Sequence, residues 1–374
     1  MKRIKLLCIV GTRPEAIKMA PVIQALHEEP WADCRVLATA QHRHMLDQVL
    51  RLFDIGADID LNIMRPNQAL NALTARMLLD LDAALEVESP DAVLAQGDTT
   101  TVMAAALACF HRRIPFGHVE AGLRTGDLGN PFPEEMNRVI ASQLAQWHFA
   151  PTERSRANLL REGCEASHIW VTGNTVIDAL LRVAATHPDP GVPIDPSRRL
   201  ILVTAHRREN FGPPFETICR AIRHLADTYP DVQVLYPVHP NPNVRELAHA
   251  LLGQHERITL REPLDYAAFV GAMQRAYLIL SDSGGVQEEA PALGKPVLVL
   301  RQETERPEAV AAGVVELVGT DFDTIVGAAR RLLDDEAAYR AMAKGASPYG
   351  DGRAAERIVT ALREQLKNCG GPSD

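Results

Sequence analysis

Short apolar runs alternate with helical patterns along most of the chain, and this alternation limits the folds that it can form. The apolar runs lack a period of two, as in strands covered on both faces of a sheet. Between them, apolar residues recur every three or four positions, which is typical of the buried face of a helix. The alternation predicts a parallel, doubly wound sheet. In the first half, strands are expected at residues 5–10, 35–40, 92–96, 115–120, 148–150 and 169–172.

A proline-rich stretch divides this pattern in two. Residues 187–199 read HPDPGVPIDPSRR and predict a linker. We therefore predict two Rossmann-like doubly wound domains, residues 1–186 and 200–353, with a helix at 354–368 joining the first. Two such domains facing each other leave a cleft at the carboxyl ends of their strands, where ligands bind. After the linker, strands are expected at residues 200–204, 232–238, 257–261, 277–281 and 297–300, and helices at 215–229 and 265–276.

Composition narrows the class of protein. A length of 374 residues suits about two domains, and a net charge of −9 argues against a nucleic-acid partner. No apolar run approaches the ~20 residues of a membrane span. The start resembles a signal peptide only superficially, because its apolar part is short and broken by Lys5, so we expect a first strand and a cytoplasmic protein. Six scattered cysteines without a C-x-x-C pair indicate reduced thiols and no zinc knuckle.

Residues 277–296, YLILSDSGGVQEEAPALGKP, predict a strand, a tight turn and the start of a helix. Gly284 and Gly285 allow the backbone to approach a ligand, and the free N–H groups of a first helical turn suit a phosphate. Glu288 and Glu289 could favour the helix dipole or accept hydrogen bonds from sugar hydroxyls. An ordinary turn with acidic capping remains the alternative.

Basic residues follow other expected strands. Arg13 and Lys18 flank a helix start after the first strand and could meet a diphosphate, or form a solvated basic pair. His206, beside Arg207 at a strand end, could neutralise a phosphate, and His239 holds the equivalent place one strand later. Arg301 and Arg306 follow the last obvious strand, at residues 297–300.

Carboxylates gather at the same rim. Asp98 and Glu120 each follow a strand, and Glu134 begins a helix. Each taken singly could be a helix cap, but three suggest acid–base chemistry on a sugar. There is no G-x-G-x-x-G after the first strand and no P-loop, which weakens the oxidoreductase and NTPase readings. His42 and His44 have metal-like spacing without a carboxylate cluster, so we expect no metal.

Together these motifs resemble the non-hydrolysing UDP-N-acetylglucosamine 2-epimerases. The resemblance implies a GT-B-like two-domain enzyme, usually a homodimer, that interconverts UDP-GlcNAc and UDP-ManNAc without metal or nicotinamide and supplies ManNAc units for cell-surface polysaccharide. The matching stretches, in order, are GTRPEAIKMAP, TAQHRHMLDQVL, QGDTTT, HVEAGLRT, PFPEEMNR, TGNTVIDAL, TAHRREN, SDSGGVQEEAP and TERPE.

The resemblance also implies roles for single residues. Those implied to be catalytic are Asp98, Glu120, Glu134 and His206. Those implied to contact UDP or the sugar are Arg13, Lys18, Phe269, Ser283, Gly284, Gly285, Glu289 and Arg306. A second, regulatory UDP-GlcNAc is implied at Gln41, Glu134, Arg207 and His239, with His44 and Asn67 at two positions that are often Gln and Arg.

The implied reaction agrees with elementary chemistry. The sugar's C2 proton is not acidic, so its removal has to accompany departure of UDP from C1, giving a 2-acetamidoglucal. The sequence does not say which carboxylate removes the proton and which returns it. A GT-B-type glycosyltransferase, a hydrolysing relative and a nucleotide-sugar sensor remain alternatives.

Overall fold

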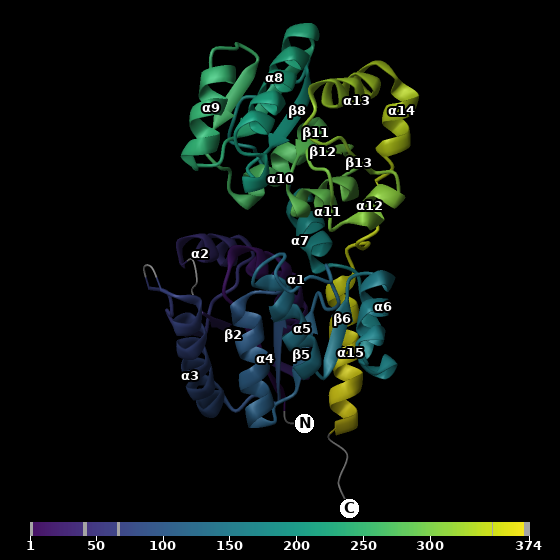
Figure 1. The fold of residues 1–374 in the computed structure, drawn as a ribbon. Coiled ribbons are helices and arrows are strands. Elements are labelled where there is room, and N and C mark those ends of the chain that lie inside the picture. The colour runs from purple at the N-terminus through teal and green to yellow at the C-terminus, as the bar shows by residue number, and fades with distance from the viewer. Residues whose placement is uncertain (1–2, 40–42, 66–67, 346, 370–374) are drawn as a thin grey trace, which may run out of the picture. The chain divides into compact units, whose positions relative to one another are not determined.

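The computed structural model describes residues 3–39, 43–65, 68–345 and 347–369, and the chain divides into two compact units (Figure 1). Unit 1 comprises residues 1–179 and 349–374, and unit 2 comprises residues 180–348. The first boundary lies inside helix α7 (Thr175–Ala184). The chain therefore passes between the units twice.

Unit 1 contains a parallel sheet, and its described strands have the order β3-β2-β1-β4-β5-β6-β7. Leu7 and Ile9 of β1 are fully buried with Phe116 of β5 in an apolar core shared with the neighbouring helices. The strands are β1 (Ile4–Val10), β2 (Ala32–Ala38), β3 (Ile59–Asp60), β4 (Ala92–Gln96), β5 (Phe116–Val119), β6 (Trp147–Ala150) and β7 (Ile169–Val171).

Helices cover this sheet, and Figure 1 shows α3, α4 and α5 side by side. Because parallel crossovers are right-handed, reversal of the strand order at β1 places the helices on opposite faces. Thr12 and Glu15 form a capping box at the start of α1, which fixes the turn after β1. The helices are α1 (Arg13–His27), α2 (Arg43–Leu52), α3 (Leu70–Glu88), α4 (Thr100–Arg112), α5 (Glu134–Leu144), α6 (Glu153–Arg161) and α15 (Ala354–Cys369).

Unit 2 also contains a parallel sheet, and its described strands have the order β10-β9-β8-β11-β12-β13. Phe215, Ile222 and Tyr236 lie fully buried in its core. Its strands are β8 (Arg199–Thr204), β9 (Val232–Pro237), β10 (Ile258–Arg261), β11 (Ala276–Ser281), β12 (Val297–Val299) and β13 (Val315–Leu317). Its helices are α8 (Pro213–Thr228), α9 (Pro242–Leu252), α10 (Tyr266–Arg275), α11 (Gly284–Ala292), α12 (Pro307–Ala311), α13 (Phe322–Asp334) and α14 (Glu336–Met342).

The structure confirms two doubly wound parallel sheets and differs from the sequence prediction in detail. Strands β3 and β13 were not predicted, and β13 follows the strand that the sequence suggested was last. Residues 187–199, predicted as a linker, lie within unit 2, where the Pro188 carbonyl accepts a hydrogen bond from Arg275 of α10 at 3.1 Å. Helix α15 packs on α1 in unit 1. Within the described ranges, no helix is both long and apolar enough to span a membrane.

Candidate functional site

Each sheet reverses its strand order at one point, between β1 and β4 in unit 1 and between β8 and β11 in unit 2. Loops leaving the two strands on either side of such a point diverge and open a crevice where ligands bind. In unit 1 these loops hold Asp98 and lead into Arg13 at the start of α1, and in unit 2 they hold His206 and Ser283. Most site residues predicted from the sequence therefore lie at or next to one of the two reversals.

Glu120, directly after β5, is a carboxylate held by several donors in unit 1. Its two oxygens accept hydrogen bonds from Lys18 Nζ at 2.6 and 2.8 Å. Asn174 Nδ2 donates to Oε1 at 2.9 Å, and Gln96 Nε2 donates to Oε2. Glu120 also has a φ of +63°, a conformation uncommon for a residue with a Cβ and often found at functional sites. Lys18, expected to contact substrate, forms an ion pair with this carboxylate.

Asp98 lies in the loop after β4, and its neighbours hold both its backbone and its side chain. Arg138 Nε donates to the carboxylate at 3.0 Å, and Asn137 Nδ2 donates to the Asp98 carbonyl at 2.9 Å. His118 Nε2 donates to the preceding Gly97 carbonyl at 2.7 Å. Burial lowers the pKa of His118 to about 4, so this ring is neutral and donates through a single N–H.

Glu15, in the first turn of α1, links the loop after β1 to the loop after β4, where the strand order of unit 1 reverses. It accepts hydrogen bonds from the backbone N–H groups of Gly11 at 2.6 Å and Thr12 at 2.8 Å, and from the hydroxyl of Thr99 beside Asp98. Burial raises the pKa of Glu15 to about 7, although these hydrogen bonds oppose the shift. The sequence pattern alone indicates no separate role for Glu15.

Two adjacent acids at the start of α5 differ sharply. Glu134, predicted to be catalytic, is half-buried, whereas Glu135 is almost completely buried. Glu135 accepts hydrogen bonds from the backbone of Thr125 and Gly126 and from Arg138 at 2.9 Å. It therefore stabilises the loop before α5, and Glu134 is the acid of this pair that keeps solvent access.

In unit 2, His206 follows β8 and stacks on His239, with ring centroids 5.4 Å apart. Asp282, at the end of β11, accepts hydrogen bonds from the backbone N–H groups of His206 and Arg207 at 2.8 and 2.9 Å. Asp282 was not among the predicted site residues. The signal in the sequence that could have marked it is an acidic residue directly after the expected strand 277–281.

Helix α11 begins where the glycine pair predicts. Ser283 is its N-cap residue and uses no side-chain hydrogen bond to cap the helix, and Gly285 is exposed. A Cβ on Gly284 would lie 3.9 Å from Arg207 Nη2, so this guanidinium lies near the helix start. Free N–H groups and a nearby cation suit an anion such as a phosphate.

Glu288 and Glu289 of α11 each contact a polar side chain from another segment of unit 2. Glu289 accepts a hydrogen bond from the hydroxyl of Tyr266 at 2.8 Å, and Glu288 forms a buried ion pair with Arg306. Glu288 is thus the partner of a predicted substrate-contacting arginine. Phe269 lies half-buried on α10, the helix that also supplies Tyr266.

Arg301 is buried between two carboxylates. Its Nε donates to Glu209 at 2.6 Å and its Nη1 donates to Glu305 at 2.8 Å. Burial opposes the shift, but hydrogen bonds from Arg301 lower the pKa of Glu305 to about 2. Glu305 also lies 3.7 Å from Arg207, so this ionised carboxylate helps to place that arginine.

Of the other predicted residues, the structure describes Arg13 and His239. Arg13 is half-buried in the first turn of α1, and His239 is exposed. Gln41 and Asn67 lie outside the described residues, as does the side chain of His44.

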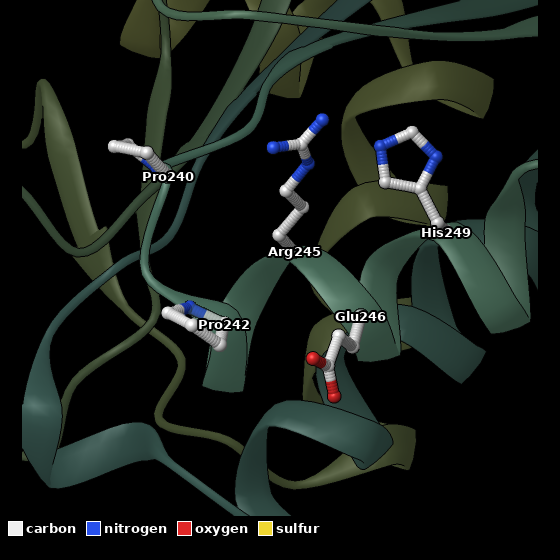
Figure 2. A pocket seen from close by; sticks show the side chains of 5 residues that line it. All are labelled: Pro240, Pro242, Arg245, Glu246 and His249. Atoms are coloured by element: carbon white, nitrogen blue, oxygen red, sulfur yellow. The ribbon is translucent and has the colours of Figure 1, made fainter.

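A surface hollow lined by Pro240, Pro242, Arg245, Glu246 and His249 contains no predicted site residue (Figure 2).

Comparison with known proteins gives one consistent family. The sequence profile described as "UDP-N-acetylglucosamine 2-epimerase" matches residues 24–363. The UDP-N-acetylglucosamine 2-epimerase of Escherichia coli (strain K12) is 55% identical over 373 residues, covering 96% of this chain and 98% of the relative.

Solved structures agree with the sequence relatives. The UDP-GlcNAc 2-epimerase of Neisseria meningitidis, solved bound to UDP-GlcNAc, has a TM-score of 0.89 and 49% identity, covering 96% of this chain and all of that one. The S. aureus MnaA structure, solved with UDP, has a TM-score of 0.87 and 47% identity, with full coverage of both chains. The chain therefore belongs to the UDP-N-acetylglucosamine 2-epimerase family.

Proposed function

We propose that this protein interconverts UDP-GlcNAc and UDP-ManNAc by eliminating UDP and adding it back through a 2-acetamidoglucal. The observation that carries the mechanism is the environment of Glu120, a buried carboxylate in a left-handed backbone conformation that receives donors from Lys18, Gln96 and Asn174. Such a costly arrangement is typical of functional sites. The family relationship supports the substrate, since the related Neisseria meningitidis enzyme was solved with UDP-GlcNAc.

The proposed reaction begins with an elimination. A carboxylate takes the proton from C2 while the C1–O bond to UDP breaks, and the bonding electrons leave with UDP. The sugar is then a 2-acetamidoglucal, with a double bond between C1 and C2. UDP returns to C1 as a proton is delivered to the opposite face of C2, which inverts that carbon. Asp98, Glu120 and Glu134 supply the proton transfers and balance the positive charge that develops at C1.

Unit 2 supplies the groups that would bind UDP. The N-terminus of α11 at Ser283, Gly284 and Gly285 suits the diphosphate, and His206 adds a donor for the leaving group. Glu289, held by Tyr266, suits a pair of ribose hydroxyls. The other residues that we place against the nucleotide sugar are Arg13, Lys18, Phe269 and Arg306.

Broader properties of the enzyme belong to the same proposal. The enzyme acts in the cytoplasm as a homodimer, needs no metal or nicotinamide, and supplies ManNAc units for cell-surface polysaccharide. A second UDP-GlcNAc binds as an activator at Gln41, Glu134, Arg207 and His239.

One experiment tests the reaction. Purified protein is incubated with UDP-GlcNAc in deuterated water, and proton NMR follows the anomeric signals. We expect UDP-ManNAc to appear and deuterium to enter C2. Epimerisation with the original C2 hydrogen retained would contradict the elimination. Free ManNAc with UDP would indicate a hydrolase, transfer only to an added acceptor a glycosyltransferase, and unchanged UDP-GlcNAc a sensor.

A further inference from the structure

Asp282 is a fully buried carboxylate to which neither the family relationship nor the proposed reaction gives a role. One of its oxygens, Oδ2, accepts three hydrogen bonds. The backbone N–H groups of His206 and Arg207 donate at 2.8 and 2.9 Å, and Asn210 Nδ2 donates at 3.1 Å. These contacts hold the loop after β8 to the end of β11.

The second oxygen of Asp282 is placed differently. Oδ1 is buried and has no hydrogen-bond donor among the residues that the structure describes, although a buried carboxylate oxygen normally has one. The imidazole of His206 lies beside it, with Nδ1 3.6 Å from Oδ1. The orphaned oxygen therefore faces an imidazole nitrogen that can carry a hydrogen.

The surroundings of His206 limit what else can hold the ring. His239, from the loop after β9, stacks on it with the two ring planes 13° apart. Burial lowers the pKa of His206, and His239 and Arg207 act in the same direction, whereas Asp282 alone acts to raise it. Asp282 is thus the one group among these that favours a hydrogen on the Nδ1 side.

We propose that Asp282 is a positioning residue for His206: it accepts the hydrogen on Nδ1, so that Nε2 faces the phosphate of the substrate and donates to it when the ring takes up a second proton. Stacking on His239 fixes the plane of the ring, and Asp282 fixes which nitrogen faces inward. When a second proton is bound at Nε2, the imidazolium lies between the Asp282 carboxylate and the diphosphate. The part that concerns the phosphate rests on the proposed function, whereas the tautomer does not.

The substitution Asp282→Asn separates this role from a purely structural one. The amide oxygen can keep the three donors on the loop, while the amide NH₂ faces Nδ1 and requires it to accept. We expect the neutral ring of the variant to carry its hydrogen on Nε2. We also expect the pKa of His206 to fall further, since the opposite charge that raises it has been removed. The kcat/KM for UDP-GlcNAc should fall by roughly tenfold or more.

The measurement is ¹⁵N NMR of protein with labelled histidines, with the His206 signal assigned through His206→Gln. Asp321→Asn is the matched control, because Asp321 also accepts a backbone hydrogen bond at a helix start in unit 2, but the side chain that it contacts is the Thr324 hydroxyl and not a histidine. We expect it to leave the His206 signal and kcat/KM unchanged. An unchanged tautomer in Asp282→Asn would overturn the proposal.

The wild-type spectrum decides the matter even if Asp282→Asn does not fold. A His206 that carries its hydrogen on Nε2 in an active wild-type enzyme would overturn this inference and leave the proposed function standing. A His206 with an Nδ1 hydrogen, in a protein that leaves UDP-GlcNAc unchanged, would support the contact with Asp282 and overturn the proposed function.

Discussion

The ammonium group of Lys18 lies 2.6 Å from one oxygen of Glu120 and 2.8 Å from the other, and both side chains are largely shielded from water. Removing one partner of a buried pair leaves the other charge uncompensated. We expect Lys18→Met to lower the free energy of unfolding by roughly 3 kcal/mol. Urea unfolding measures this. Arg340→Met, which breaks an exposed pair with Glu336, is the control and should change little. Equal losses in the two variants would contradict the prediction.

Loss of a predicted catalytic carboxylate in unit 1 should lower turnover without abolishing UDP binding. We expect Asp98→Asn, Glu120→Gln and Glu134→Gln each to lower kcat by roughly 10² or more, because general acid–base contributions are of that size. Titration calorimetry should show UDP still binding. Glu153→Gln, an exposed acid in the first turn of α6, serves as the control and should retain full turnover. Near-normal turnover in all three site variants would refute the assignment.

Glu15 should make the stability of the protein depend on pH. Burial raises its pKa from the ordinary 4.5 to about 7, so between these values the native state keeps a proton that the unfolded chain releases. The free energy of unfolding therefore falls as the pH rises through this window, by on the order of 3 kcal/mol. Glu15→Gln cannot ionise and should lose this slope, which urea unfolding at about pH 5 and pH 8 would detect. Glu153→Gln should keep the slope, and a slope retained in Glu15→Gln would assign it to other groups.

The second UDP-GlcNAc site gives a kinetic prediction. We expect UDP-ManNAc alone to be turned over slowly, with a lag that a trace of UDP-GlcNAc removes. By linkage, active-site ligands must then change the affinity of the second site as well. Initial rates in the UDP-ManNAc direction measure this. Prompt hyperbolic turnover without UDP-GlcNAc would mean that His44 and Asn67 have abolished the control.

The elimination route transfers no hydride and so predicts independence from redox cofactors. We expect turnover to persist after dialysis against a chelator and without added NAD. Activity is compared before and after dialysis, with Mg²⁺ restored in one sample. Complete loss that Mg²⁺ reverses would contradict the prediction.

The sequence predicted the elements whose pattern is local. The run 277–281 with its glycine pair marked β11 and the start of α11 to within one residue, because a buried strand followed by glycine is a short-range signal. Strand β3 contains only two residues, which is too short for any periodicity to be detected.

The partners of the site residues could not be predicted in the same way. Lys18 and Glu120 are 102 positions apart and meet only because the order of the strands brings α1 next to the end of β5. Glu134 and Glu135 are chemically alike and adjacent, so only the fold shows which one is buried. Asp282 precedes a recognisable turn, but its role depends on a loop that is more than 70 residues away.

The position of α15 sets an order of assembly during synthesis. Most of unit 1 is synthesised before unit 2, yet α15, whose buried Ile358 and Leu362 complete it, is made after the whole of unit 2. While the ribosome synthesises residues 180–348, the nascent first unit lacks the helix that packs on α1. Unit 2 is therefore the first to have its complete sequence, and a chain that stops before residue 354 would leave apolar surface of α1 open to aggregation or to a chaperone.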